Sequence, residues 1–294
     1  MKAPAFEYVL PESLAEVHEA LSEARASDVV AKILAGGQSL VPLMNFRLAR
    51  PDRLVDINRI GALRYHDSAA ASLRVGALCR HADIEKNRHL VARVGALADA
   101  IPLIGHAAIR SRGTVVGSLA HGDSLAEWIS LALLLDGTVL LSSTAGERVV
   151  PAGEWLQGYL KTAAEDDEIV REASFSLPGD SDGTAFVELA RRHGDFCLVS
   201  AGAFLALGER GTIASARVVL AGIGPVPFRD QAIESLLAGE PATAETFERV
   251  VAALPKSGAQ DDVHATAAYR HHAIGVITVR ALMTAARRAQ DQRR

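Results

Sequence analysis

Apolar residues in the first quarter of the chain alternate between helical and strand-like patterns. In residues 13–26 they recur every three or four positions behind Pro11, which predicts an amphipathic helix. The apolar run at 29–34 predicts a buried strand, and the segment Ala-Gly-Gly-Gln-Ser at 35–39 interrupts it. The elements expected next are a short helix at 40–48 and strands at 54–57 and 73–77. Strands that alternate with helices in this way predict α/β layers.

The middle of the chain adds two helices, a second glycine-containing loop and a hairpin. Residues 90–100 are predicted to form a helix that stops before Pro102, and residues 111–118 to form a loop. A further helix is expected at 125–135, with Glu127 in its first turn, where the helix dipole favours an acidic side chain. The strands of the hairpin are expected at 139–142 and 148–151.

A change of pattern near residue 179 predicts a domain boundary. The segment Pro-Gly-Asp-Ser-Asp-Gly at 178–183 has the composition of a linker, and the charged run at 165–168 that precedes it is expected to be a solvated turn. Beyond the linker, strands are expected at 199–207 and 216–220, and helices at 232–237, 246–254 and 269–288. The sequence therefore predicts a domain at 1–178 followed by an α+β domain at 179–294.

Composition and charge exclude several classes of function. Hydrophobic residues make up 49% and charged residues 22% of the 294 positions, which is typical of a globular protein. The net charge of −4 and the lack of a basic patch argue against nucleic-acid binding. No apolar run reaches the roughly 18 residues of a membrane span, and the N-terminus has no signal-peptide core. A cytoplasmic location is therefore expected.

The two cysteines limit the redox chemistry of the chain itself. Cys79 and Cys197 are far apart and form no CxxC pair, so neither a zinc ribbon nor a four-cysteine iron–sulfur site is expected within this chain. No histidine pair has the spacing of a metal site, and no GxSxG or HExxH motif is present. His106 and His121 flank the second loop and are expected to be structural or surface residues, and Asp56 to cap a turn.

Two small-residue loops are the candidate binding elements. The first, at 35–39, joins a strand to a helix, and the second is Arg-Gly-Thr-Val-Val-Gly-Ser at 112–118. Glycine lets the backbone approach a diphosphate closely, and backbone N–H groups before a helix favour anions. Two such loops could hold the two ends of one long anionic ligand, although each could equally be a simple turn. The segment at 191–196 could place an aromatic ring over a flat cofactor or be only a strand end with a turn.

Four segments of the sequence resemble those of a known protein family. They read AGGQSLVPLMNFRLARPDRLVDINRI at 35–60, IRSRGTVVGSLAH at 109–121, RRHGDF at 191–196 and DVHATAAYR at 262–270. In this order and spacing they resemble the medium subunits of the xanthine dehydrogenase and carbon monoxide dehydrogenase family. The resemblance covers nearly the whole chain, including its C-terminal domain.

The resemblance implies a fold and a cofactor. The expected fold is an FAD-binding fold of the vanillyl-alcohol oxidase type, with two α/β subdomains divided near 56–60, followed by a C-terminal domain with a small antiparallel sheet and helices. FAD is expected to be bound non-covalently. The positions that match the family's cofactor-binding residues are Ala35, Gly36, Gly37, Gln38, Ser39, Thr114, Val115, Val116, Gly117, Ser118, Glu127 and Phe196. Glu127 matches an acidic residue beside the flavin, and Phe196 an aromatic residue near the isoalloxazine ring.

Val116 departs from the family pattern, in which the second loop usually has glycine at this position. A β-branched side chain is stiff and disfavours positive φ. If the loop needed such a conformation, Val116→Gly would leave FAD binding equal or tighter.

The function implied by the resemblance is electron relay in a molybdenum hydroxylase. A small partner with two [2Fe–2S] clusters would supply electrons, a large partner would carry molybdopterin, and FAD in this chain would pass the electrons to an external acceptor. A dimer of heterotrimers is implied. Two other readings remain open, namely a self-sufficient flavin oxidase and a flavin-free scaffold subunit.

Overall fold

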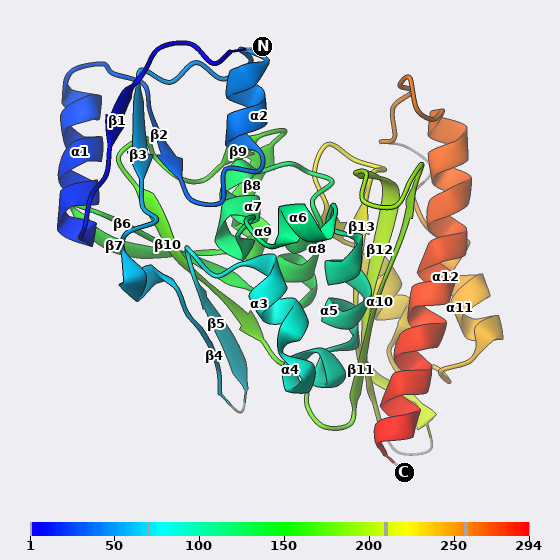
Figure 1. Cartoon of the computed structure of the whole chain (residues 1–294). Coiled ribbons are helices and arrows are strands. Elements are labelled where there is room, and N and C mark those ends of the chain that lie inside the picture. The colour runs from blue at the N-terminus through cyan, green and yellow to red at the C-terminus, as the bar shows by residue number, and fades with distance from the viewer. Residues whose placement is uncertain (1, 70, 209–210, 256–257, 294) are drawn as a thin grey trace.

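The N-terminal part of the structure is a small parallel sheet (Figure 1). The computed structural model describes residues 2–69, 71–208, 211–255 and 258–293. Strands β1 (Glu7–Val9), β3 (Arg53–Asp56) and β2 (Ala31–Leu34) pair in this order, both times in parallel. Helices α1 (Leu14–Ala26) and α2 (Leu40–Asn45) provide the crossovers that parallel strands need. The carboxyl ends of β2 and β3 therefore meet at one edge, and the first loop leaves from that edge.

An antiparallel sheet follows, with the strand order β4-β5-β10-β6-β7. Its strands are β4 (His66–Ser68), β5 (Ser72–Gly76), β6 (Thr138–Ser143), β7 (Gly146–Pro151) and β10 (Ile169–Ser176). The hairpin expected around Gly146 is β6–β7, and the φ of 125° at Gly146 explains why glycine stands at its turn. The central strand β10 pairs with both β5 and β6, so the sheet joins segments nearly a hundred residues apart.

Short helices fill the space between this sheet and the C-terminal part of the chain (Figure 1). They are α3 (His81–Lys86), α4 (Arg88–Arg93), α5 (Gly95–Ala100), η2 (Ile101–Leu103), α6 (Ala107–Arg110), α7 (Val115–His121), α8 (Glu127–Leu134) and α9 (Ala152–Trp155). The single turn η1 (Gly61–Leu63) is not part of this group and connects β3 to β4. A small hairpin of β8 (Leu156–Gly158) and β9 (Lys161–Thr162) follows α9. The charged run after it is a turn, as expected, but Glu168 is half-buried and pairs with Arg148.

The continuous helix predicted at 90–100 is wrong, because it breaks at Val94 into α4 and α5. A side chain at Gly95 would lie 2.6 Å from the carbonyl oxygen of Thr184, so α5 packs directly on a strand of the C-terminal part. The N–H of Ala96 also donates to Thr184 Oγ1 at 3.1 Å. The break therefore coincides with a tertiary contact, and Gly95, which follows it, also disfavours a continuous helix.

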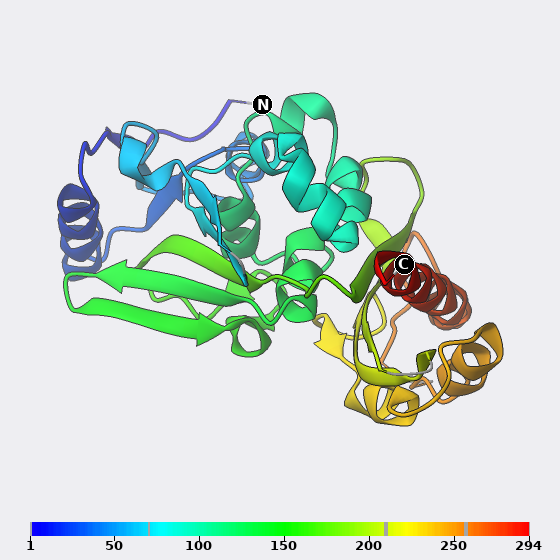
Figure 2. The ribbon, with the colours of Figure 1, turned by 90° about the horizontal axis from the view of Figure 1, so that it is seen from below.

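The C-terminal part is a four-stranded antiparallel sheet with helices on one face (Figure 2). In order along the sheet, the strands are β11 (Asp182–Ala190), β12 (Cys197–Leu207), β13 (Ile213–Ala221) and β14 (Phe228–Arg229). The helices are α10 (Gln231–Leu237), α11 (Ala244–Val251) and α12 (Ala267–Gln292). Gly183 lets the backbone of α12 approach β11 closely at Ala285. The predicted α+β class, with a small antiparallel sheet and helices after the FAD-binding domain, is confirmed.

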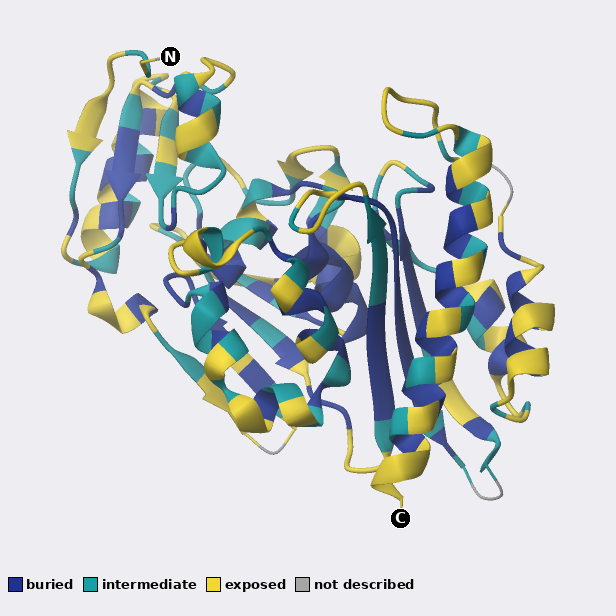
Figure 3. Cartoon of the chain, turned by 45° about the vertical axis from the view of Figure 1, so that its right-hand side comes forward, coloured by how far each residue is buried: buried dark blue, intermediate teal, exposed yellow. Residues whose placement is uncertain are grey.

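Buried residues, dark blue in Figure 3, form two hydrophobic clusters, and the C-terminal sheet contributes one face to each of them. One face packs on α12 through residues such as Ala185, Val199 and Ala201. The other face contributes Phe186 and Phe204 to the core that includes α5 and α8. Residues 177–181 connect β10 to β11 and so join the two parts of the chain. None of the helices in the described ranges is both long and apolar enough to cross a bilayer.

Candidate functional site

The two small-residue loops, far apart in sequence, touch at Gly36. A side chain built at Gly36 would lie 2.5 Å from the carbonyl oxygen of Arg112 and 2.8 Å from Gly113 Cα. Both neighbours are backbone atoms, so neither can move aside as a flexible side chain would. Gly36 is therefore required for the contact between the loops. Gly37, with a φ of 73°, supplies the left-handed turn that leads into α2.

These loops present several backbone N–H groups without an internal partner. Within the described chain, the N–H groups of Gly37, Gln38 and Ser39 donate no hydrogen bond, and the same holds for Thr114 and Val116 on the second loop. Unpaired N–H groups gathered in one place form a binding site for an anion. The arrangement therefore fits the diphosphate of a dinucleotide cofactor.

The prediction of a loop at 111–118 is wrong in its second half, because residues from Val115 onward belong to helix α7. Thr114 is the N-cap of this helix, and its Oγ1 accepts the N–H of Gly117 at 3.0 Å. A side chain at Gly117 would lie 2.5 Å from that oxygen, so in this geometry a larger residue would force the Thr114 hydroxyl to shift.

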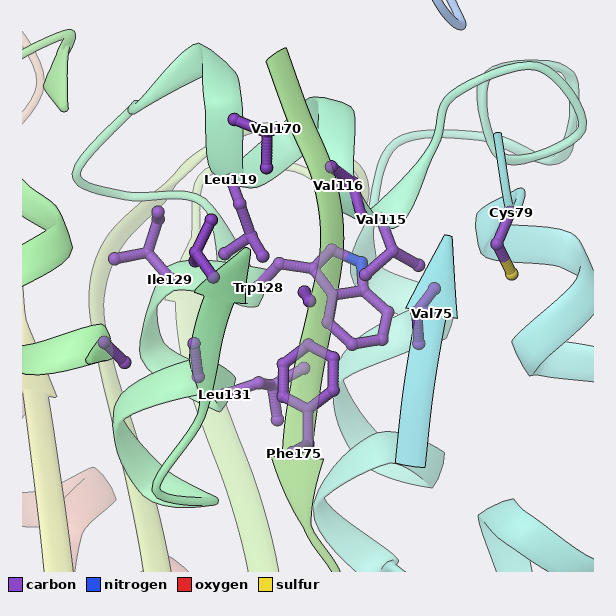
Figure 4. Close-up of a cluster of buried hydrophobic side chains, with 14 of the residues drawn as sticks. Val75, Cys79, Val115, Val116, Leu119, Trp128, Ile129, Leu131, Val170 and Phe175 are labelled. Carbon is purple, nitrogen blue, oxygen red and sulfur yellow. The ribbon is translucent and has the colours of Figure 1, made fainter. Parts of the chain in front are cut away.

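Val116 does not need a positive φ, because it lies in the first turn of α7 and is not among the residues with left-handed backbone. Its side chain is 2% exposed and packs in the same apolar cluster as Val115, Leu119 and Trp128 (Figure 4). The reason for expecting Val116→Gly to improve FAD binding is therefore wrong. In this chain, Val116 contributes to the core beneath the helix.

We expect Val116→Gly to destabilise the protein by roughly 3 kcal/mol, from the lost burial of a valine and the entropic cost of glycine in a helix. FAD affinity is not expected to rise. Urea unfolding of the variant measures the change. Val276→Gly in α12 is the matched control, since Val276 is 40% exposed and should lose only the helix cost, about 1 kcal/mol. Equal losses in the two variants would contradict a packing role for Val116.

Two polar residues that the sequence did not single out tie the loops together. Asn58 Nδ2 donates to the carbonyl oxygen of Ala35 at 2.8 Å, and Arg80 Nη2 donates to Asn58 Oδ1 at 2.8 Å. Arg80 Nη1 also donates to the carbonyl oxygen of Arg112. The expected cap by Asp56 is confirmed, since its Oδ1 accepts the N–H of Asn58 at 2.9 Å. The only available signal for Asn58 was its place after the carboxyl end of β3.

A buried histidine supports the second loop from below. His81 Nδ1 accepts the indole N–H of Trp128 at 3.0 Å, and the two rings stack with a centroid separation of 6.3 Å. A side chain at Gly113 would lie 2.9 Å from the His81 ring. Burial, with Arg110 and Arg80 nearby, lowers the pKa of His81 to about 4, so the ring is neutral at pH 7. Figure 4 shows Trp128 and Phe175 in the cluster that this histidine borders.

The other two predicted cofactor-binding residues, Glu127 and Phe196, are not part of the two loops. Glu127 begins α8 and is 7% exposed, and burial raises the pKa of its carboxyl to about 7. Phe196 is 56% exposed and directly precedes Cys197, whose Sγ lies 3.7 Å from the carbonyl oxygen of Leu125. Glu127 and Cys197, the residue after Phe196, therefore both border the segment 122–126 that links α7 to α8.

The flanking histidines behave as expected of structural or surface residues. His106 is exposed, and Gly194 of the 191–196 segment packs against it. His121 is half-buried at the end of α7, and burial lowers its pKa. Among the described residues, no group of three His, Cys, Asp or Glu side chains is placed to hold a metal ion.

Comparison with known protein families accounts for most of the chain. Residues 4–178 match the family described as FAD binding domain in molybdopterin dehydrogenase. Residues 184–285 match the family described as CO dehydrogenase flavoprotein C-terminal domain.

Individual relatives align over nearly their full length. The 6-hydroxypseudooxynicotine dehydrogenase complex subunit alpha of Paenarthrobacter nicotinovorans is 35% identical, covering 99% of this chain and 97% of the relative. The carbon monoxide dehydrogenase medium chain of Hydrogenophaga pseudoflava is 32% identical, covering 97% and 98%. Among solved structures, quinoline 2-oxidoreductase from Pseudomonas putida 86 superimposes with a TM-score of 0.91 at 33% identity, covering 98% of this chain and 99% of that one.

Proposed function

Because the chain belongs to the family of FAD-binding medium subunits of molybdenum hydroxylases, we propose that it passes electrons from [2Fe–2S] clusters of a partner through FAD to an external acceptor. The chain is an oxidoreductase subunit, and its cofactor is FAD. In this family the molybdenum and iron–sulfur cofactors are carried by other subunits. The flavin suits a relay because it accepts electrons singly and can deliver two.

The touching loops are the observation that carries this proposal. Gly36 brings the two loops together, and five backbone N–H groups of these loops have no hydrogen-bond acceptor among the described residues. The residues proposed to hold FAD are Ala35, Gly36, Gly37, Gln38, Ser39, Thr114, Val115, Val116, Gly117 and Ser118. Val115 and Val116 can act only through their backbones, since both side chains are buried.

The ring end of the flavin is proposed to lie near Glu127 and Phe196. Phe196 offers an exposed aromatic face, and Glu127 lies at the start of the neighbouring helix. We propose two domains. Residues 1–178 form the FAD-binding domain, whose two subdomains divide near 56–60, and residues 179–294 form the C-terminal domain.

A relay needs an electron donor outside this chain. Cys79 and Cys197 are both buried and unpaired, so neither is available to ligate a surface cluster. The proposed partners are a small [2Fe–2S] subunit and a large molybdopterin subunit, in a dimer of heterotrimers. The unpaired thiols support a reducing compartment, and we propose the cytoplasm.

We expect the purified chain to carry one FAD that acid precipitation releases fully into the supernatant. The contacts available to FAD are hydrogen bonds and packing, and these are lost when the fold is lost. Chromatography of the supernatant identifies the flavin. Flavin retained in the pellet would contradict non-covalent binding, and FMN in place of FAD would contradict a site built for a diphosphate.

The relay itself is tested by the native complex. We expect this chain to co-purify with an iron–sulfur and a molybdenum subunit, and its flavin to be reduced by the organic substrate only in their presence. Size-exclusion chromatography with metal analysis and anaerobic flavin spectra provide the measurements. Reduction of the isolated chain by a small substrate would favour a flavin oxidase, and a complex without flavin would favour a scaffold subunit.

A further inference from the structure

The segment 262–270 is one of the four that carry the family resemblance, yet it contributes no residue to the two loops. Its last residue, Arg270, lies in the first turn of α12 and is only 5% exposed. A guanidinium group keeps its charge when it is buried, so its N–H donors need acceptors inside the protein. The acceptors of Arg270 therefore indicate what the segment does.

Arg270 joins the loop before α12 to the start of β12. Its Nη2 donates to Asp262 Oδ2 at 2.6 Å, and its Nη1 donates to the carbonyl oxygen of Leu198. Asp262 is itself fixed, because its Oδ1 accepts the N–H groups of His264 at 2.8 Å and Ala265 at 2.9 Å. The ion pair thus anchors the start of β12 to a loop that is closed by its own hydrogen bonds.

Leu198 lies at a bulge between β11 and β12. The register of the two strands shifts between Leu189 and Ala190, and this shift leaves Leu198 without a paired residue on β11. A bulge redirects the strand and can re-aim a side chain toward a functional site. The carbonyl oxygen of the bulged residue accepts its hydrogen bond from Arg270 instead. Phe196 is two residues before the bulge, so Arg270 fixes the backbone next to Phe196.

The turn at 191–196 is held at two further points. Arg191 Nη1 lies 2.9 Å from His264 Nδ1, so the start of the turn is tied to the loop before α12. At the tip, Gly194 has a φ of 85°, and a side chain there would lie 2.9 Å from the carbonyl oxygen of Gly105. The turn therefore bridges the loop before α12 and the segment that leads through α6 to the second loop.

We propose that Arg270 and Asp262 are positioning residues for the flavin ring, because they hold the turn at 191–196 so that Phe196 meets the ring in one orientation. This inference rests on the proposed function, which places the ring at Phe196. The Phe196 side chain is 56% exposed, so packing within the chain does not fix it. An aromatic contact depends on the geometry of the two rings, and here that geometry must come from the backbone.

The test compares variants of the full chain by FAD titration and by the visible circular dichroism of the bound flavin. Phe196→Leu removes the aromatic ring, and we expect it to weaken FAD binding about fivefold and to change the dichroism. Arg270→Lys should produce a comparable change, since lysine lacks the fork that bonds Leu198 and Asp262 together. The double variant should bind FAD no more weakly than Phe196→Leu, because Arg270 acts through Phe196.

Arg280→Lys is the matched control on the same helix, since Arg280 is exposed and its side chain makes no hydrogen bond to a described residue. It should leave FAD affinity and dichroism unchanged. If Arg270→Lys does not fold, Arg191→Met removes the other anchor of the turn at an exposed position. Arg192→Met removes the same charge from a neighbouring exposed residue without such an anchor, so only Arg191→Met should change the dichroism.

Wild-type affinity and dichroism in Arg270→Lys, or effects that add fully to those of Phe196→Leu, would overturn the inference. Equal spectra for Arg191→Met and Arg192→Met would do the same. A Phe196→Leu variant that matches the wild type would overturn it together with the proposed ring position. In each case a normal FAD content and turnover of the complex would leave the proposed relay intact.

Discussion

Replacing Gly36 with alanine is expected to weaken FAD binding by about 100-fold or more, which corresponds to roughly 2.7 kcal/mol. The added methyl group would lie 2.5 Å from the carbonyl oxygen of Arg112, and this contact must open. Opening it separates the two sets of N–H donors that the diphosphate requires together. Isothermal titration of the flavin-free protein with FAD gives the affinity.

Gly61→Ala is the control for this substitution. Gly61 begins the short helix η1, and an added methyl group there would meet nothing within 4 Å. FAD affinity and folding should both match the wild type. If Gly36→Ala bound FAD as tightly as Gly61→Ala, the contact between the loops would not shape the cofactor site.

Acidification is expected to destabilise the protein through His81. Its pKa is about 4 in the folded protein, chiefly because it is buried, against 6.5 for an ordinary histidine. Below pH 6.5 the unfolded chain binds a proton that the folded chain does not. The stabilisation is therefore complete above pH 6.5 and is lost as the pH falls toward 4, by about 3 kcal/mol in total.

His81→Gln isolates this contribution, because glutamine can still accept the indole N–H of Trp128. The variant has no titrating group at position 81. The difference in unfolding free energy, wild type minus variant, should therefore fall by about 3 kcal/mol between pH 7 and pH 4. Urea unfolding across this range measures the difference. His89→Gln, at an exposed position, should keep the wild-type pH dependence. A pH-independent difference between His81→Gln and the wild type would show that the pKa of His81 is the same in the folded and the unfolded protein.

Local pattern was enough to place most of the regular elements. The helix predicted at 13–26 is α1, and Ser13 caps it by accepting the N–H of Glu16. The hairpin around Gly146 and the long C-terminal helix were also predicted within a few residues. These elements have strong apolar periodicity or a turn residue that only one backbone conformation suits, and both signals are local in the sequence.

The errors occur where distant segments meet. The helix predicted at 90–100 breaks at Val94, where Gly95 packs on Thr184. Half of the second loop is helical because Thr114 caps α7 above a buried cluster. Val116 was expected to disfavour the backbone conformation of the loop, whereas its side chain is buried in the core. No periodicity in the 109–121 segment could show which of its side chains would face Trp128.

The sequence by itself determined the family, the α+β class and the two glycine-containing segments, because these depend on residue identity and spacing along the chain. The tertiary structure alone decided that Gly36 touches Arg112 and Gly113, and that Asn58 and Arg80 link the two loops. The physical reason is that close approach, burial and charge interaction depend on distances between segments that lie from about 20 to more than 70 residues apart. Such distances are fixed only when the two cores pack.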